Sequence, residues 1–244
     1  MNKIITLWAT CRSRSTAFER MMFERGDMHI FHEPFGRYYY FSSERQSQRA
    51  EHIIPAPEYE FEYILNSIFD KAARQTVFIK EQAFQAEKKI SDDVLLQLSN
   101  TFLLRHPQEV IPSMHNKLAD FNQKELGYRS LFHIFERVQQ LSGKPPLLID
   151  SDDLITCPEK VAKAYCRAVG IPFIAEALTW EPSLPPEFVW WDDGSWLKDV
   201  GESSSFKTTL KKYAEIEGNS FLQAAYDESM PYYEKMIQYK LNLD

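Results

Sequence analysis

The 244-residue sequence predicts an α/β protein with three layers, in which helices flank a mostly parallel central sheet. Two observations predict this class. Short apolar runs that resemble buried strands alternate with longer segments whose apolar residues recur at helical spacing. Hydrophobic residues make up 44% of the chain, which is enough for a sizeable core. No internal repeat, long linker or domain boundary is visible, so we expect one domain over residues 1–244.

Each predicted element follows from its local pattern. Strands are expected in the apolar run that begins at Ile4 and in residues 27–36, 76–80, 101–104 and 147–150. Helices are expected from Ser15 and over residues 58–74, 92–98, 108–116, 128–142 and 158–169, with a helical pair over 207–240. The aromatic and polar residues around 36–57 predict a substrate lid, and the Pro- and Trp-rich residues around 174–206 predict an irregular cap.

The turn between the first strand and the first helix is unusually basic. Arg12 and Arg14 alternate there with hydroxyl residues, in the order Arg12, Ser13, Arg14, Ser15, Thr16. Free N–H groups and the helix dipole favour an anion at such a turn. The alternative is a helix capped by Ser15 or Thr16 beside two solvated arginines. The turn lacks the glycines and lysine of the Walker A motif, which disfavours an ordinary ATPase or GTPase.

Charge and cysteine content narrow the class of protein. The net charge of −7 argues against a general nucleic-acid or membrane-surface binder. The three cysteines lack metal-ligand spacing, and their odd number predicts free thiols in a reducing compartment. We expect no signal peptide, and no stretch approaches the ~20 apolar residues of a membrane span. We therefore predict a cytoplasmic protein.

Three stretches, taken in order, resemble the sulfotransferases that use 3′-phosphoadenosine 5′-phosphosulfate (PAPS). They are Cys11-Arg12-Ser13-Arg14-Ser15-Thr16, then Arg105-His106-Pro107 with Ser113, and finally Leu148-Ile149-Asp150-Ser151-Asp152-Asp153-Leu154 with Gly170-Ile171-Pro172. The first resembles the family's phosphosulfate loop in its arginine-bearing bacterial form. Arg14 stands where many members have glycine, so either the turn needs no positive φ there or the loop has another shape. The resemblance implies a P-loop NTPase-like fold.

This resemblance implies two anion sites, because PAPS carries charge at its 5′-phosphosulfate and its 3′-phosphate. The 5′ site would use the residues Arg12, Ser13, Arg14, Ser15, Thr16 and Ala17. Arg105, which can form forked hydrogen bonds, and Ser113 would hold the 3′-phosphate and remain with the product PAP. The family requires no metal, and the sequence has no persuasive metal-ligand cluster.

The acceptor must lose a proton, which calls for a base. Cytosolic sulfotransferases use a histidine two residues after a strand lysine, but here Gln82 follows Lys80 at that position. The trehalose-type bacterial enzymes use a glutamate after the second strand. Glu33 is placed like that glutamate, and we favour it over His32 as the base; its alternative role is an ion pair with Arg12 or Arg14. Lys80 and Arg12 would assist the transfer, although a strand-end lysine is also consistent with a solvated terminus.

The acceptor is predicted to be a small molecule bound by aromatic side chains. Candidate contacts are His32, Tyr38, Tyr39, Trp190 and Trp191. Aromatic rings beside Asp192 and Asp193 suit a cationic acceptor, and packing of the lid is the alternative. Lys198 and Ser205 are weaker candidates, more consistent with a solvated loop. A monomer or homodimer is expected. Alternative functions are a P-loop kinase-like phosphotransferase and a non-catalytic nucleotide-binding protein of the same fold.

Overall fold

The central element is a five-stranded, all-parallel sheet with the strand order β2-β3-β1-β4-β5, as the computed structural model of residues 2–190, 194–206 and 215–243 describes it. The strands are β1 (Ile4–Ala9), β2 (His29–His32), β3 (Val77–Gln82), β4 (Ser99–Leu104) and β5 (Leu147–Asp150). Because all strands are parallel, their carboxyl ends lie along one edge. The predicted fold class is confirmed.

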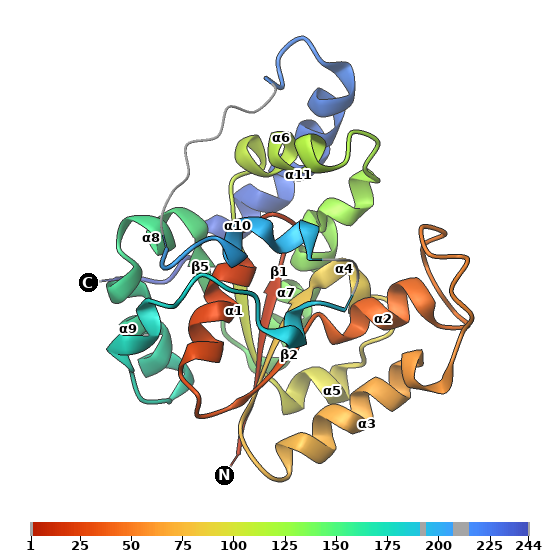
Figure 1. Cartoon of the computed structure of the whole chain (residues 1–244). Coiled ribbons are helices and arrows are strands. Elements are labelled where there is room, and N and C mark those ends of the chain that lie inside the picture. Colours follow the sequence, from red (N-terminus) through yellow and green to blue (C-terminus); the bar gives the residue numbers. More distant parts are fainter. Residues whose placement is uncertain (1, 191–193, 207–214, 244) are drawn as a thin grey trace.

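Helices cover both faces of this sheet (Figure 1). One face packs against α2 (Pro34–Phe41), α3 (Phe61–Ala72), α4 (Ala83–Ala86), α5 (Asp92–Gln97), α6 (Pro107–Lys117), α7 (Tyr128–Ser142) and α11 (Ser220–Ile237). The other face packs against α1 (Ser15–Glu24), α8 (Ser151–Thr156) and α9 (Pro158–Val169). The result is the predicted three-layer arrangement.

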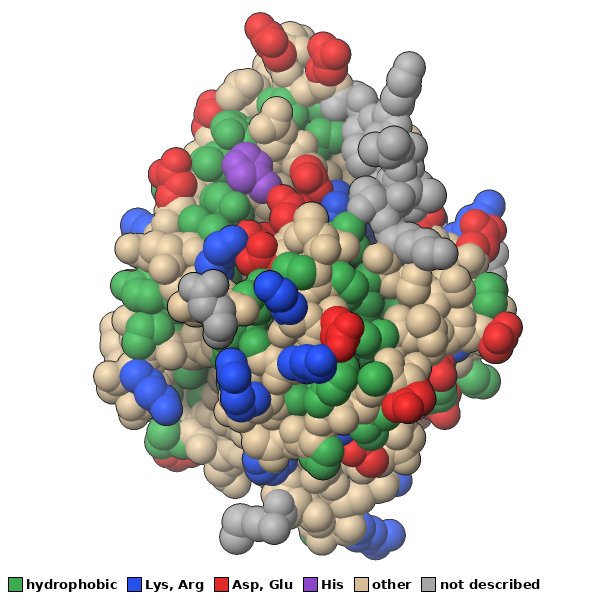
Figure 2. All heavy atoms as spheres, turned by 90° about the vertical axis from the view of Figure 1, so that its left-hand side faces the viewer, with side chains coloured by type: hydrophobic (Ala, Val, Ile, Leu, Met, Phe, Trp, Pro, Cys, Tyr) green, Lys and Arg blue, Asp and Glu red, His purple; other side chains and the backbone are tan. Residues whose placement is uncertain are grey.

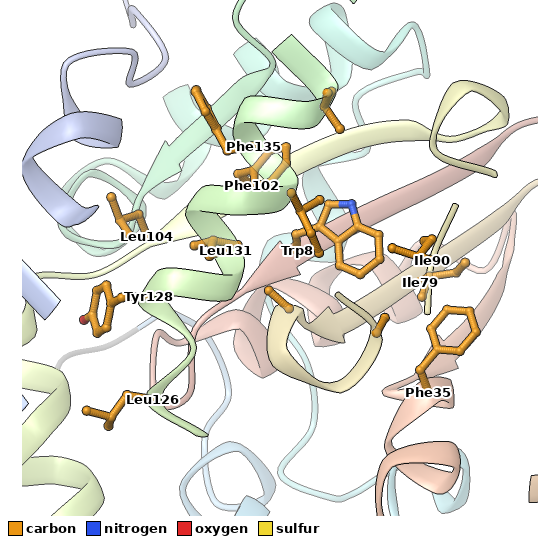
Figure 3. Packing of buried hydrophobic residues seen from close by; sticks show 14 of the residues in the cluster. Trp8, Phe35, Ile79, Ile90, Phe102, Leu104, Leu126, Tyr128, Leu131 and Phe135 are labelled. Atoms are coloured by element: carbon orange, nitrogen blue, oxygen red, sulfur yellow. The ribbon is translucent and has the colours of Figure 1, made fainter. Parts of the chain in front are cut away.

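Strand β1 runs through the middle of the core and supplies side chains to both faces. All its residues are buried: Ile4 and Trp8 point to one hydrophobic cluster, and Ile5 and Leu7 to the other. Figure 3 shows the Trp8 indole among hydrophobic side chains from several other elements. The Trp8 indole N–H donates to Asn100 Oδ1 at 2.8 Å, so the buried polar atom of the ring is satisfied. This packing fixes the residue at which β1 ends and the basic turn begins.

Several expected boundaries differ from the structure. Strand β3 continues to Gln82, two residues beyond the expected end at Lys80, because Trp8 and Ala9 of β1 pair with its last residues. The expected irregular segment contains short helices: η3 (Ala175–Leu178), η4 (Pro186–Phe188), η5 (Ser195–Leu197) and α10 (Lys198–Gly201). Of the expected C-terminal helical pair, α11 is present, while residues 207–214 lie outside the described residues.

Basic side chains also occur away from the carboxyl edge of the sheet. Figure 2 shows the side of the molecule that carries α8 and α9, where Lys and Arg side chains lie beside hydrophobic ones. Lys160, Lys163 and Arg167 of α9 line a hollow of about 480 Å³ together with Phe173. None of these four residues lines the larger cavity at the sheet edge described next.

Candidate active site

A cavity of about 730 Å³ lies at the carboxyl edge of the sheet. All eight residues predicted to hold the cofactor line it: Arg12, Ser13, Arg14, Ser15, Thr16, Ala17, Arg105 and Ser113. His32 and Glu33, which follow from the next strand along the chain, line the same cavity. Its volume is typical of a small-molecule site. Parallel strand order thus brings residues from separate stretches of sequence into one space.

The basic turn has a strained backbone. Arg12 has φ 54° and Arg14 has φ 71°, both in the left-handed region that glycine occupies most easily. Glu33, with φ 43°, is the third non-glycine residue with positive φ in the described part of the chain. All three line the cavity. The turn therefore does require a positive φ at position 14, where many family members have glycine. In this chain Arg14 adopts that conformation.

Helix α1 begins directly at this turn. Arg14 is its N-cap residue, and its side chain makes no capping hydrogen bond, so the alternative of a helix capped by Ser15 or Thr16 is wrong. The Ser13 hydroxyl instead donates to the Thr10 carbonyl at 2.7 Å, which closes the turn behind the helix. A helix N-terminus without a side-chain cap directs N–H groups at the cavity, where an anion stabilises them.

The two predicted anion sites are joined by their side chains. Arg12 Nε donates to Ser113 Oγ at 3.2 Å, and Arg105 donates to the Arg12 carbonyl oxygen at 2.8 Å. The Arg12 guanidinium also lies 3.5 Å from a carboxylate oxygen of Asp199, in the predicted cap segment. We had expected two separate basic clusters; the backbone turn at Arg12 brings them into contact.

Glu109 is a residue of this site that the sequence analysis missed. Its Oε2 accepts from Arg105 Nε at 2.7 Å and from the Arg14 guanidinium at 3.1 Å. Arg14 also donates to the Ser151 hydroxyl at 2.9 Å and to an Asp152 carboxylate oxygen at 3.0 Å. The signal in the sequence was the spacing of four between Arg105 and Glu109, which brings side chains together on a helical turn.

Glu33 and Lys80 form a buried ion pair. Glu33 also accepts from Gln82 at 3.0 Å and from Gln85 at 3.4 Å, and its own N–H donates to the Lys80 carbonyl. Burial raises the pKa of Glu33, but the positive charge of Lys80, the electrostatic effect of His32 and the hydrogen bonds from Lys80 and Gln82 outweigh it and lower that pKa to about 2. Burial lowers the pKa of the Lys80 ammonium, yet Glu33 and Glu19 raise it overall. Glu33 is therefore ionised at neutral pH, and its partner is Lys80 rather than Arg12 or Arg14.

His32 is held by two neighbours that the sequence analysis did not identify. Its Nδ1 lies 2.7 Å from Oε2 of Glu19, a fully buried residue of α1. Its ring stacks on Phe188, with centroids 5.0 Å apart. Glu19 directly follows Phe18 and lies on the buried side of α1. Sequence periodicity does not reveal such a residue, because a glutamate is expected on the exposed face of a helix.

The predicted aromatic contacts are only partly present. Tyr38 and Tyr39 do not line the cavity: Tyr38 packs on Phe61 in the core, and the Tyr39 hydroxyl donates to Glu125. Residues 34–41 form helix α2 at the start of the predicted lid, and this helix turns these two rings inward and leaves Tyr40 toward the cavity. Trp191, with Asp192 and Asp193, lies outside the described residues.

Trp190 lines the cavity and packs against α2. Its ring contacts Phe41 edge to face, and a Cβ added at Gly36 would lie 2.5 Å from an indole carbon. Gly36 therefore permits the close approach of the cap segment to α2. Ser205 also lines the cavity, whereas Lys198 does not.

The cysteine thiols do not take part in disulfides. All three thiols are free, as predicted. Burial, together with the negative charges of Glu33 and Glu125, raises the pKa of Cys11. The Cys11 thiol donates to the Glu125 carbonyl, which makes it an unreactive packing group.

Within residues 2–190, 194–206 and 215–243, no cluster of His, Cys, Asp and Glu has the arrangement of a metal site, and no helix has the length and apolarity to cross a bilayer.

Comparison with known proteins connects this geometry to a family. A family model described as a sulfotransferase domain matches residues 2–239. The chain is 25% identical over 210 residues to branched-chain-amino-acid aminotransferase-like protein 2 of Arabidopsis thaliana, and 26% identical over 215 residues to protein 1 of the same name. Each match covers 86% of this chain but only 37% and 38% of those relatives, so this chain spans less than two fifths of their length.

Solved structures of similar fold carry related descriptions. The sulfotransferase domain from the curacin biosynthetic pathway superposes with a TM-score of 0.52 at 14% identity, covering 99% of both chains. The sulfotransferase domain of the Synechococcus PCC 7002 olefin synthase gives 0.52 at 15% identity, covering 99% of this chain and 96% of that one. A sulfotransferase from Alicyclobacillus acidocaldarius gives 0.51 at 11% identity, covering 99% and 98%. At these identities the likeness establishes the fold.

Proposed function

This chain belongs to the sulfotransferase domain family, and from that premise we propose that it transfers a sulfuryl group from PAPS to a hydroxyl or amine of a small-molecule acceptor. Family membership implies the enzyme class, a PAPS-dependent sulfotransferase. One observation carries the proposal for this chain: the eight predicted cofactor residues and the predicted base Glu33 line a single cavity.

The residues at the cofactor end suit the charge distribution of PAPS. The N-terminus of α1, with no side-chain cap, offers N–H groups and a positive dipole end to the 5′-phosphosulfate. Arg105 and Ser113 offer a guanidinium fork and a hydroxyl to the 3′-phosphate. Glu109 and Asp152 already neutralise part of this positive charge, so the arginines stay ordered without a ligand.

When bound, PAPS supplies the sulfuryl group, which leaves the phosphate oxygen with the bond electrons as the acceptor atom bonds to sulfur and loses its proton. The chain's own task is to position the acceptor in line and to stabilise charge. Glu33 accepts the proton through a carboxylate oxygen that faces the cavity. Arg12, which lines the cavity, places positive charge beside the transferred group, whereas Lys80 does not line the cavity and acts through its ion pair with Glu33.

The ion pair with Lys80 sets the protonation state of Glu33 before the reaction. The ion pair keeps Glu33 ionised and so ready to accept a proton, but it also lowers the basicity of the carboxylate. A shift of the Lys80 ammonium toward the transferring group would weaken the ion pair and raise the pKa of Glu33 during the reaction. His32, fixed by Glu19, is the second candidate base.

The residues behind the predicted cationic acceptor lie in different places. Tyr38 and Tyr39 pack inward, Tyr40 and Trp190 line the cavity, and Trp191, Asp192 and Asp193 lie outside the described residues. We retain the small-molecule acceptor and propose that the protein acts in the cytoplasm, where its three free thiols stay reduced.

A donor comparison tests the proposed function. The protein is incubated with a mixture of phenols, sugars and amines and with either PAPS or ATP, and products are identified by mass spectrometry. We expect acceptor sulfation and equimolar release of 3′,5′-adenosine bisphosphate with PAPS, and no phosphorylation with ATP. Phosphorylated acceptors with ATP would instead support a kinase-like phosphotransferase. Tight bisphosphate binding without transfer to any acceptor would support a non-catalytic binding protein.

A further inference from the structure

We propose that Arg49 binds an anionic group of the acceptor, so that the acceptor is a hydroxyl or amine compound that also carries a carboxylate. This inference rests on the proposed function and names the acceptor class. Arg49 lines the cavity that Glu33 lines, and 30% of its side-chain surface is exposed. The cations at the cofactor end, by contrast, belong to the basic turn and to Arg105.

The loop that carries Arg49 is built around a different arginine. Arg45 donates to three backbone carbonyls of this loop: Ser42 at 3.3 Å, Ala50 at 2.9 Å and Ile53 at 2.8 Å. These bonds use all three nitrogens of the Arg45 guanidinium and hold the loop closed. Arg49 therefore is not needed to shape the loop that presents it.

Arg49 itself keeps most of its hydrogen-bonding capacity. Among the described residues its guanidinium makes a single ion pair, with Glu125 at 3.4 Å. Glu125 is 3% exposed, and it also accepts from the Tyr39 hydroxyl at 3.4 Å and from the Ser47 side chain. A guanidinium offers five N–H donors in a planar fork that matches a carboxylate. The unused donors favour an anion, and the occupied Glu125 oxygens disfavour a cation at this place.

Tyr40 lines the same cavity as this pair and the predicted base. The negative charges of both Glu125 and Glu33 act on its hydroxyl, and Tyr40 and Phe84 line the cavity. An acceptor with an apolar or aromatic body can therefore contact these rings while its hydroxyl or amine faces Glu33 and its carboxylate faces Arg49. Such an acceptor would be held at both ends, by Glu33 and by Arg49.

Three phenols that differ in one group test the inference: hydroxyphenylpropionate, its methyl ester and tyramine. Each is titrated calorimetrically into the protein, with and without saturating 3′,5′-adenosine bisphosphate, for wild type and for Arg49→Gln. Arg137→Gln is the matched control, because Arg137 lies on α7 outside the cavity lining, pairs with Asp92 and, like Arg49, has 30% of its side-chain surface exposed. We expect the carboxylate to bind at least about tenfold more tightly than the ester, and this preference to vanish in Arg49→Gln alone.

A second variant separates acceptor binding from a structural role of Arg49. In Glu125→Gln the partner charge of Arg49 is removed, and the preference for the carboxylate should persist or grow. The inference is overturned if the carboxylate binds no better than the ester, if tyramine binds most tightly, or if the preference survives in Arg49→Gln. Failure of the proposed function is read separately, as lack of bisphosphate binding, because the phenol titrations without bisphosphate still report on Arg49.

Discussion

The turns that follow β1 and β2 use the same backbone device for opposite charges. Both leave parallel strands at one edge of the sheet, and both place non-glycine residues in the left-handed region, Arg12 and Arg14 in the first and Glu33 in the second. The first turn presents cations and a helix N-terminus; the second presents a carboxylate. Such strained residues persist only where the surrounding structure holds them, which is typical of functional sites.

The difference lies in what each turn needs from the rest of the chain. The β1 turn carries its charge in its own sequence and receives a few contacts from Ser113, Glu109 and Asp152. The state of Glu33 is set almost entirely by neighbours from β3 and α4, with Lys80 first among them. The proposed cofactor end, defined locally, and the proposed acceptor end, defined by tertiary contacts, should therefore respond differently to substitution.

The largest expected effect is on catalysis through Glu33. Glu33→Gln keeps the size and the hydrogen-bonding shape of the side chain but removes the proton acceptor. We expect sulfuryl transfer to fall about 10²–10⁴-fold, the usual contribution of a general base. Bisphosphate affinity, measured by calorimetry, should stay within about twofold. Transfer at the wild-type rate would assign the base to another group, for which His32→Asn is the corresponding test.

The next effect is on stability through Lys80. Lys80→Met leaves the Glu33 carboxylate buried without its cation, and we expect a loss of about 3–5 kcal/mol in the free energy of unfolding measured with urea. The double variant Lys80→Met/Glu33→Gln should recover part of this loss, because no unpaired charge remains. If the double variant instead lost as much stability as the two single variants together, Lys80 and Glu33 would not be energetically coupled.

The pH dependence of stability tests the same pair. The pKa of Glu33 is lowered to about 2, below the value of an unfolded glutamate, so the unfolded chain binds the proton more tightly. The pair therefore stabilises the fold above pH ~4.5, and this contribution disappears as the pH falls toward 2, by about 3 kcal/mol in total. Glu33→Gln should show a shallower acid limb in urea unfolding between these values. An unchanged limb would contradict the assigned pKa.

The smallest effect concerns the backbone of the β1 turn. Arg14→Gly and Arg14→Ala both remove the contacts with Glu109 and Asp152, but only glycine adopts φ 71° without strain. We expect the glycine variant to be more stable than the alanine variant by about 1 kcal/mol in thermal unfolding. Equal stability of the two variants would mean that the turn relaxes to another conformation.

The same contrast explains how far the sequence alone could predict the site. The five strands and most of the helices follow from periodicity, whereas the proposed cofactor residues follow from charges adjacent to strand ends and from the resemblance to the sulfotransferase family. Glu19 and Glu125 escaped prediction because their roles depend on contacts with His32 and Arg49 from distant segments. The inward orientation of Tyr38 and Tyr39 could not be predicted either. The helical register of α2 turns them inward, and that register depends on packing against Phe61 and Phe84.

The central claim, that the basic turn and Arg105 hold the two charged ends of PAPS, is tested most directly by binding of 3′,5′-adenosine bisphosphate. Calorimetry compares this ligand with AMP and ATP for wild type, for Arg105→Ala and for Arg137→Ala, a control that removes an arginine paired with Asp92 away from the cavity. The account predicts that wild type prefers the bisphosphate and that Arg105→Ala alone weakens its binding by about 2 kcal/mol. Equal binding of AMP and the bisphosphate, or no effect of Arg105→Ala, would contradict it.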